Sequence, residues 1–390
     1  TELKKINISN GKIIKEKYLL NLKENWASCI FHKYTCDWNL DHRILSNKCM
    51  KLAKFLYFVF FVFYSMSSFA EKSFFEDISN LLPDQKPRLS YGVAVTDFDS
   101  DGADEFIVTG FGYENLALGY DGNSLQNKIK ENIFSDFNRS TIGVAACDID
   151  KDGQEEIYFL NTDTYSGQKM YSDRLLKFVD KNIEDLFEKD INQDELNLTA
   201  GRSVVCVDRE GKGNYGIYVA NYGGPTRFYE YIDNRVVDLA ESLKLDEITG
   251  GRAVVAGHIL SDQMDIFAAN ERGPNFLYFN KEGKFLDVAG QMNVRDIYQN
   301  GRGTALSDIL YRGRLDILNG NWGGYHRAYV YDEYKFKDIA VPSFDEPSRI
   351  RTVISADFDN DGYDEVFLNN IGEPNKLFKI VENGVFQEIK

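Results

Sequence analysis

Short runs of apolar residues, separated by polar loops that contain glycine, recur through most of the chain. One unit, an apolar run followed by a polar loop and a second apolar run, begins at Val93, Val144, Val204, Val254, Ala305 and Val353. The residues that end the first run stand 51, 60, 50, 50 and 49 positions apart and are Asp97, Asp148, Asp208, His258, Asp308 and Asp357. A period of about fifty residues is typical of β-propeller blades.

A second pair of short apolar segments follows in the repeats, at 227–240, 275–289 and 376–389. Turns such as Glu-Gly and Asn-Gly within these segments predict β-hairpins, so each repeat supplies four strands. A single sheet of this kind leaves apolar faces exposed, whereas stacked sheets bury them. The sequence therefore predicts an all-β fold, a β-propeller of four-stranded blades with six repeats visible.

The segment Phe74–Ile78 stands before the first repeat, yet it resembles the last strand of a blade, such as Phe285–Val288. A strand in that place is expected to close the ring by pairing with a blade from the other end of the chain. We expect the seven-bladed type, with the last strands beyond Lys390. A six-bladed ring with a spare strand is the alternative.

Residues 50–70 have the layout of a signal peptide: Lys51 and Lys54, an apolar run over 55–64, and small residues up to Ala70. The apolar run is shorter than the roughly 20 residues of a membrane-spanning helix, which favours cleavage before Glu71. An uncleaved anchor over 52–69 is the alternative. Either reading places residues 71–390 outside the cytoplasm, as a secreted, periplasmic or cell-surface domain.

Residues 1–49 precede this export segment and show no apolar periodicity. One interpretation is translated upstream sequence, with Met50 as the true start. The other is a short cytoplasmic tail before an anchor, because nine basic residues there outnumber five acidic ones.

The charge of the chain is strongly negative, and removing residues 1–70, with 11 basic and 5 acidic residues, moves it from −16 to −22. Such a balance argues against nucleic acid and anionic membranes and favours divalent cations or basic partners. A membrane is expected only if residues 50–70 remain as an anchor. Cys147 and Cys206 each lie in an apolar run, so two buried free thiols are expected rather than a bridge.

Three loops carry Asp at positions 1, 3 and 5, Gly at position 6 and Glu at position 9. Calcium takes six to eight oxygen ligands, and alternate positions of a tight loop can converge on one ion. About three Ca²⁺ ions are therefore expected, with the carbonyl groups of the seventh residues included. The ligand sets are Asp97, Asp99, Asp101, Ala103 and Glu105; Asp148, Asp150, Asp152, Gln154 and Glu156; Asp357, Asp359, Asp361, Tyr363 and Glu365.

These loops are not EF-hands, because position 12 is Val108, Phe159 or Leu368 within a strand-like run. The other three repeats have lost the pattern: Lys212 and Arg312 stand at position 5, and the fourth loop is one residue short. They are not expected to bind calcium. Arg312 is expected to replace the ion by pairing with Asp308 and Asp316.

With its three DxDxDGxxE loops and the segments 273–278, 372–378 and, more loosely, 224–229, the chain resembles FG-GAP or VCBS repeat propellers. That family includes integrin α-subunit propellers and the secreted cartilage acidic protein family with its bacterial relatives. The resemblance, over about residues 74–390, implies a calcium-stabilised, usually seven-bladed propeller for extracellular binding or adhesion. Three degenerate loops and the missing C-terminal module of many relatives leave the partner, a protein or a carbohydrate, open.

No catalytic residues are assigned, because the sequence carries none of the common nucleophile, metalloprotease, phosphate-loop or dinucleotide motifs. His258 takes the place of a loop Asp, and His326 follows Trp322 and Tyr325 in an aromatic patch that is expected to be core or rim rather than a ligand site. A polysaccharide-acting lyase or hydrolase is the alternative function, and a purely structural surface protein a third. A deep axial cleft with converging polar groups would favour the enzyme.

Four arginines stand six residues before the repeat anchors: Arg202, Arg252, Arg302 and Arg351. This register predicts a ring around the axis. Salt bridges between blades are the favoured explanation, and an anion-binding ring is the alternative.

Overall fold

The computed structural model describes residues 75–82, 87–179, 182–381 and 384–389. All of these lie in one compact unit, Phe74–Lys390. The interpretations of residues 1–49 and of the export segment 50–70 fall outside the described residues. No helix among the described residues is both long enough and apolar enough to cross a membrane.

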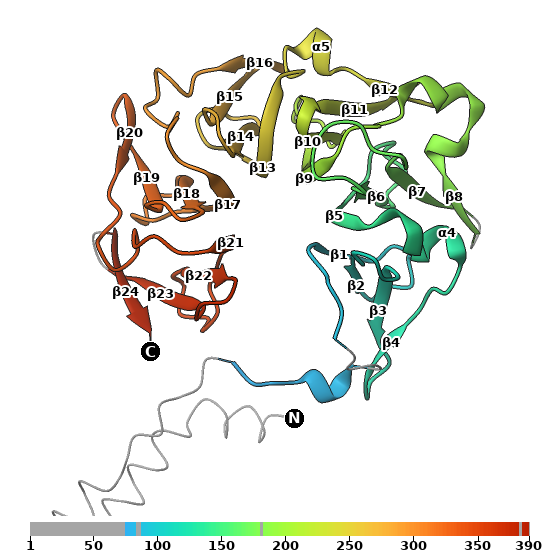
Figure 1. The fold of residues 1–390 in the computed structure, drawn as a ribbon, viewed down its shortest axis with the longest axis horizontal. Helices are drawn as coiled ribbons and strands as arrows, with labels where there is room; N and C mark the ends of the chain where they lie inside the picture. The colour runs from blue at the N-terminus through green and yellow to red at the C-terminus, as the bar shows by residue number, and fades with distance from the viewer. Residues whose placement is uncertain (1–74, 83–86, 180–181, 382–383, 390) are drawn as a thin grey trace, which may run out of the picture. The chain divides into compact units, whose positions relative to one another are not determined.

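Antiparallel four-stranded blades follow one another around an axis, as the sequence predicted (Figure 1). The first three blades comprise β1 (Val93–Thr96), β2 (Glu105–Val108), β3 (Leu116–Tyr120) and β4 (Leu125–Asn127); β5 (Thr141–Cys147), β6 (Glu156–Asn161), β7 (Arg174–Val179) and β8 (Asn182–Asp185); β9 (Gly201–Val207), β10 (Gly216–Pro225), β11 (Arg227–Ile232) and β12 (Arg235–Asp238).

The next three blades repeat this order of strands. They comprise β13 (Ile248–Gly257), β14 (Asp265–Asn270), β15 (Phe276–Lys281) and β16 (Lys284–Asp287); β17 (Gly301–Ser307), β18 (Asp316–Asn321), β19 (Arg327–Asp332) and β20 (Lys335–Asp338); β21 (Ile350–Ala356), β22 (Glu365–Asn370), β23 (Lys376–Val381) and β24 (Val385–Ile389). The third and fourth blades are also joined by pairing of the end of β10, at Tyr222 and Pro225, with the start of β13, at Gly250 and Ile248.

Helices are confined to short connections between strands. They are η1 (Ser79–Leu81), α4 (Asn132–Ser135), η2 (Phe137–Arg139), η3 (Leu186–Glu188), η4 (Asp190–Glu195) and α5 (Ala240–Leu243). The predicted hairpins are present at β11–β12, β15–β16 and β23–β24. In the β15–β16 turn both central residues, Glu282 and Gly283, have positive φ values of 53° and 77°, as a tight two-residue hairpin requires.

The hydrophobic core lies between blades rather than inside them. Successive residues of a strand face opposite neighbours: Ile217 of β10 packs with the second blade, and Tyr218 packs with the fourth. Buried clusters of this kind lie between each pair of consecutive blades among the described residues. A blade therefore depends on its neighbours for stability, as expected for a repeat protein.

The predicted closing strand is not formed by the described part of its segment. Phe75–Ile78 is exposed, is not part of a strand and leads into η1. The outermost place of the sixth blade is already taken by β24, which pairs with β23 along its whole length. The Phe75 ring instead contacts Phe358 edge to face, with the ring centroids 5.4 Å apart. The total number of blades stays a prediction.

The expectation of two free thiols is wrong, because Cys147 and Cys206 form a disulfide with their Cα atoms 6.1 Å apart. Both residues lie on first strands, β5 and β9, and these strands contact each other across the interface of the second and third blades. An apolar run predicts that the cysteine within it is buried. It does not show which cysteine lies opposite in the neighbouring blade. The bridge thus ties two blades that the sequence separates by 59 residues.

Candidate functional site

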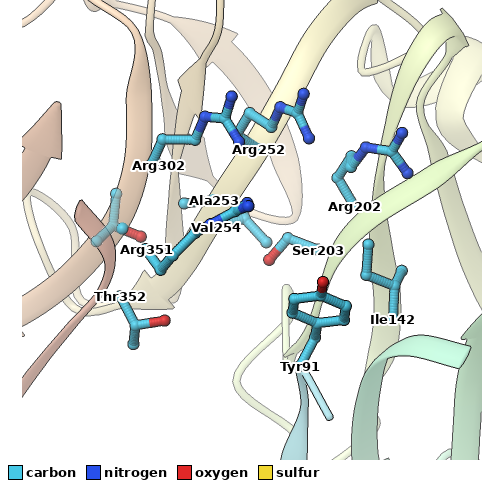
Figure 2. Close-up of a pocket in the computed structure, with 12 residues that line it drawn as sticks. Tyr91, Ile142, Arg202, Ser203, Arg252, Ala253, Val254, Arg302, Arg351 and Thr352 are labelled. Atoms are coloured by element: carbon cyan, nitrogen blue, oxygen red, sulfur yellow. The ribbon is translucent and has the colours of Figure 1, made fainter. Parts of the chain in front are cut away.

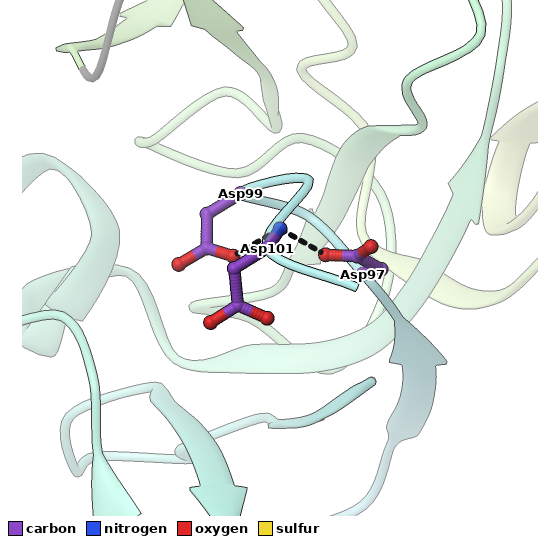
Figure 3. A group of neighbouring side chains, drawn as sticks. All are labelled: Asp97, Asp99 and Asp101. Carbon is purple, nitrogen blue, oxygen red and sulfur yellow. Dashed lines mark hydrogen bonds between the residues drawn. The ribbon is translucent and has the colours of Figure 1, made fainter. Parts of the chain in front are cut away.

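The acidic loops lie between the first and second strands of their blades, and each is organised by its first aspartate. In the first loop the Asp97 carboxylate accepts a hydrogen bond from the backbone N–H of Asp101 at 3.0 Å (Figure 3). It also accepts one from the backbone N–H of Gly102 at 2.9 Å. Asp148 and Asp357 accept the same two bonds in their own loops. The glycine at position 6 has a φ near 90° in all three, a left-handed conformation that favours glycine.

These turns bring together three groups of carboxylates, each with oxygen atoms within 4.8 Å of one another. The groups are Asp97, Asp99 and Asp101; Asp148, Asp150 and Glu156; Asp357, Asp359 and Glu365. Every member belongs to a predicted ligand set. The remaining predicted carboxylates, Glu105, Asp152 and Asp361, belong to the same three loops. The structure therefore gathers the predicted acidic residues into loop sites, and calcium binding there stays a prediction.

The seventh residues were predicted to offer their carbonyl groups. The structure shows their backbone N–H groups donating to the aspartate at position 5: Ala103 to Asp101, Gln154 to Asp152 and Tyr363 to Asp361, at 2.9, 2.9 and 3.1 Å. These bonds orient the aspartate at position 5 and hold the seventh peptide against the loop.

The glutamate at position 9 begins the second strand and is buried in all three blades, as Glu105, Glu156 and Glu365. Burial, followed by the nearby loop aspartates, raises the pKa of Glu105 to about 7. Burial also raises the pKa of Glu156 to about 6 and that of Glu365 above its ordinary value. A carboxyl group that resists ionisation among other carboxylates is stabilised by a neighbouring cation.

Buried carboxylate oxygens without a hydrogen-bond partner test whether the loops fit a metal. Both oxygens of Glu105 are in this state, as are Asp150 Oδ1 and Glu365 Oε1. An unpaired buried oxygen of this kind is costly unless a cation binds it. Hard oxygen donors on a tight loop are the ligands that calcium prefers, so the residues fit this ion.

A lysine reaches two of these loops from the third strand of the blade. Lys177 Nζ on β7 lies 2.5, 2.6 and 2.8 Å from oxygens of Asp150, Asp152 and Glu156. Lys379 on β23 approaches Asp361 closely, and Asp359 at 3.2 Å. These lysines were not among the site residues predicted from the sequence. In each blade the residue after the loop glutamate pairs with a residue of the third strand, and the lysine comes directly after that residue.

The degenerate loops keep the turn and replace the ion site with ion pairs. Arg312 donates from its backbone N–H to Asp308 at 2.8 Å, and its guanidinium lies 3.3 Å from the buried Asp316. The predicted ion pair with Asp316 is thus present, whereas Asp308 accepts only the backbone N–H bond that the first aspartate of the acidic loops also accepts. In the third blade the charges are reversed. Arg209 of the loop pairs with Glu230 on β11, and Glu230 holds the strand position that lysine occupies in the two blades described above.

The four arginines lie on the first strands β9, β13, β17 and β21 and line one axial cavity (Figure 2). Tyr91 and Ile142, at the same register in the first two blades, line the opposite wall. Two adjoining recesses of about 220 and 580 Å³ share these six residues. The predicted ring is therefore present, with arginine contributed by the third to sixth blades.

Aromatic and acidic side chains at the ends of the second strands alternate with these arginines around the cavity. Tyr222 lies against Arg202 and Arg252, with the guanidinium carbons 5.6 and 4.5 Å from the ring centroid. Trp322 lies against Arg302 and Arg351 at 5.0 and 5.2 Å. Each of these aromatic residues follows an asparagine that recurs in the repeats, so the sequence itself carries a signal for their position.

Glu271 supplies the acidic member of this alternation. Its carboxylate lies 2.5 Å from Arg252 and 3.1 Å from Arg302, so it bridges the fourth and fifth blades. The favoured explanation, salt bridges between blades, therefore applies to Arg302, through its Nη2. No carboxylate in the described part of the chain pairs with Arg202 or Arg351, and the Nε–H groups of Arg202, Arg302 and Arg351 are buried without a hydrogen-bond partner there.

The predicted aromatic patch divides between core and surface. His326 is fully buried, accepts a hydrogen bond from the backbone N–H of Asn321 at Nδ1, and contacts Ser348 Oγ through Nε2, both at 3.0 Å. Tyr325 is exposed. His258, in the short fourth loop, is exposed as well. Neither histidine lines the axial recesses.

Fold and loops together define a repeat propeller with acidic strand-loop-strand turns. A family model described as an FG-GAP-like repeat matches residues 97–159, which contain the first two acidic loops. Cartilage acidic protein 1 of Homo sapiens is 43% identical over 357 aligned positions, covering 81% of this chain and 53% of that protein. The protein of the same name from Xenopus tropicalis is 43% identical, covering 75% of this chain and 50% of its own length.

The chain belongs to the FG-GAP β-propeller family. It spans about half the length of the curated relatives it matches. Among solved structures, a crystal structure of BBS1N in complex with ARL6DN matches with a TM-score of 0.46 and 9% identity, covering 73% of this chain and 78% of that one.

Proposed function

We propose that this protein is an exported propeller, stabilised by calcium, that acts as a binding module outside the cell. The observation that carries the calcium part is the set of buried carboxylate oxygens without a hydrogen-bond partner in the three acidic loops, although Glu365 Oε1 lies 3.6 Å from the Lys379 ammonium group. Each loop joins the first and second strands of a blade, so an ion there would fix the geometry of that blade. Because blades are stabilised by their neighbours, ion binding in one loop would stabilise the whole unit.

Two observations support a location outside the cytoplasm. The Cys147–Cys206 disulfide suits an oxidising compartment, where such bridges persist. The relatives are named for cartilage and for their acidity, and this chain shares the acidity, with a net charge of −16. A protein or a carbohydrate is the proposed kind of partner, and adhesion the proposed role.

The axial cavity bears on the alternative of a polysaccharide-acting enzyme, since it is a recess with converging polar groups. Its described lining consists of arginines, hydroxyl-bearing residues and apolar residues, with Asp163 in the larger recess. Two carboxylates at the cavity are already bonded. Glu271 pairs with arginines, and Asp163 accepts from the backbone N–H groups of Met170 and Tyr171. We therefore propose binding rather than catalysis.

Calcium titration by calorimetry, with thermal unfolding in calcium and in chelator, tests the proposal on the full chain. We expect about three ions to bind. At a free concentration of one hundred times Kd each site adds about 2.7 kcal/mol to the free energy of unfolding. Asp101→Asn should remove one site, whereas Asp262→Asn, at an exposed residue of the degenerate fourth loop, should remove none. Absence of calcium binding and of any thermal shift would refute the calcium part.

The binding role is tested separately, by applying the same protein to arrays of glycans and extracellular matrix proteins in calcium and in chelator. Retention of one ligand class in calcium, lost in chelator, is the expected result. Uniform absence of retention under both conditions would count against a binding module.

A further inference from the structure

We propose that the axial arginine ring, Arg202, Arg252, Arg302 and Arg351, is a binding site for a small oxyanion with two negative charges. Sulfate, hydrogen phosphate and short dicarboxylates share this chemistry. The site goes beyond the proposed function, because it involves neither the calcium loops nor the macromolecular partner.

The charge of the cavity is opposite to that of the protein. Four guanidinium groups face two carboxylates, Glu271 and Asp163, which leaves an excess of two positive charges in a chain of net charge −16. Glu271 is shared between Arg252 and Arg302. Arg202 and Arg351 have no carboxylate partner among the described residues. A dianion would therefore neutralise the cavity.

The arginines are held so that they remain available to a ligand. The rings of Tyr222 and Trp322 lie against the guanidinium groups. Such a contact is not a hydrogen bond, so it does not use the N–H donors that point away from the ring. Arg202 also donates from Nη1 to Thr162 Oγ1 at 3.0 Å and to the Gly201 carbonyl at 2.7 Å, and from Nη2 to the Tyr165 carbonyl, which fixes its position and leaves its Nε–H without a partner among the described residues. Guanidinium groups in fixed positions bind the oxygens of sulfate, phosphate or carboxylate through paired hydrogen bonds.

Without an anion the ring is electrostatically unfavourable. Burial, together with the charges of Arg252 and Arg302, lowers the pKa of Arg202 to about 10. Burial and the charges of Arg252 and Arg351 also lower the pKa of Arg302. Four like charges brought together in a recess repel one another unless a counter-charge enters.

The smaller of the two recesses supplies neutral hydrogen-bond donors beside the arginines. Ser203, Thr304 and Thr352 lie on the same first strands and line it, and Tyr91 completes the opposite wall (Figure 2). Its volume of about 220 Å³ admits a small anion rather than a long chain. Hydroxyl donors alternating with guanidinium groups suit an anion with several oxygen atoms.

Calorimetry of the full chain tests the site directly, with calcium chelated so that the acidic loops do not contribute, at a temperature where the melting curve in chelator shows the chain to be folded. The probes are sulfate, phosphate and succinate, with acetate and chloride at equal ionic strength. We expect at least one dianion to bind at least tenfold more tightly than acetate or chloride, and to raise the melting temperature. Equal response to all five salts would mean ionic strength alone and would overturn the proposal.

Arg202→Gln and Arg351→Gln should each lower the affinity for that dianion at least tenfold. Arg349→Gln is the matched control, because Arg349 precedes the same strand, is 62% exposed and pairs with Glu373 instead. In the absence of anion the two cavity variants should melt at or above the temperature of the parent, since repulsion is relieved. Marked destabilisation of both, or affinity unchanged from that of Arg349→Gln, would assign the ring a structural role and overturn the proposal.

Discussion

Lys177 Nζ lies 2.8 Å from Glu156 Oε1, within the carboxylate group of the second acidic loop. The ammonium group therefore stands where a divalent cation would contact the same oxygens. The first loop differs, because glycine occupies the equivalent position, Gly119, and Lys128 fills the space beside it. Lysine and calcium are expected to compete for the second loop.

Replacing this lysine should tighten calcium binding. Lys177→Met keeps the length of the side chain and removes the charge, so we expect the calcium affinity of the second loop to rise by about tenfold or more. The measurement is calorimetry in a background carrying Asp97→Asn and Asp357→Asn, which leaves one intact loop. In chelator the same variant should melt at a lower temperature, because the carboxylates lose their cation.

Lys151→Met is the matched control for this prediction. Lys151 belongs to the same loop, is exposed and forms no ion pair with any residue that the structure describes. Its replacement should change calcium affinity by less than about threefold, as for an exposed charge. Equal effects of both substitutions would show that general charge, rather than competition for the site, controls affinity.

Breaking the disulfide should loosen the interface of the second and third blades. Closure of a loop of 59 residues restricts the unfolded chain, so Cys147→Ala with Cys206→Ala should lower the free energy of unfolding. The expected loss is up to about 4 kcal/mol. Chemical denaturation with and without reductant measures it. Reductant should destabilise the parent and leave the double variant unchanged, and an insensitive parent would contradict the bridge.

Arg312→Ala should destabilise the fifth blade more at high pH than at low pH. Burial raises the pKa of Asp316 to about 6 in the folded state, and Arg312 opposes this rise. A carboxyl group with a raised pKa costs stability as the pH increases through that value, so losing the cation matters most when Asp316 is ionised. Because Arg312 is 39% exposed, the expected loss at pH 8 is only about 1 kcal/mol.

Thermal unfolding at pH 5 and pH 8 measures this difference. Adding Asp316→Asn should remove most of the effect, because no buried charge is left without a partner. A melting temperature that Arg312→Ala leaves unchanged at both pH values would refute ion replacement in this loop.

Most of the architecture was predictable because the same sequence pattern recurs in six repeats. The spacing of the anchors fixed the strand-loop-strand unit, and the axial register of Arg202 and Arg351 followed from their common distance to those anchors. A repeat that must stack on its neighbours also specifies where its apolar residues are buried.

What could not be predicted depends on contacts between repeats. Cys206 meets Cys147 across two blades, and Glu271 meets Arg302 across two others. Such pairs share no local pattern, because each partner is placed by the stacking of separate sheets. The segment Phe75–Ile78 cannot be the outer strand of the sixth blade, because β24 already holds that place, so its predicted role in closing a seventh blade stays a prediction.

His326 gives the last prediction, an acid-dependent loss of stability that one substitution should remove. Burial, with a smaller effect of the Lys376 charge, lowers the pKa of His326 to about 4. The neutral ring accepts from the Asn321 N–H at Nδ1, which leaves Nε2–H to donate to Ser348. Protonation would turn the accepting nitrogen into a donor facing another donor.

The sign follows from proton uptake on unfolding. Above about pH 6.5 the histidine is neutral in both states and its contribution is fully present; as the pH falls from about 6.5 to about 4 the unfolded chain binds a proton that the folded one does not. Stability should decline through this window by roughly 3 kcal/mol from this residue.

Other blades provide the matched substitution, because Asn275 and Asn375 hold the same position and accept the equivalent backbone N–H through Oδ1, at 3.2 and 2.8 Å. His326→Asn should therefore fold, and denaturant midpoints between pH 4 and pH 7 should fall less steeply for it than for the parent. Identical slopes would show that His326 is not buried as a neutral hydrogen-bonded ring, and that the acid sensitivity arises from the carboxylates instead.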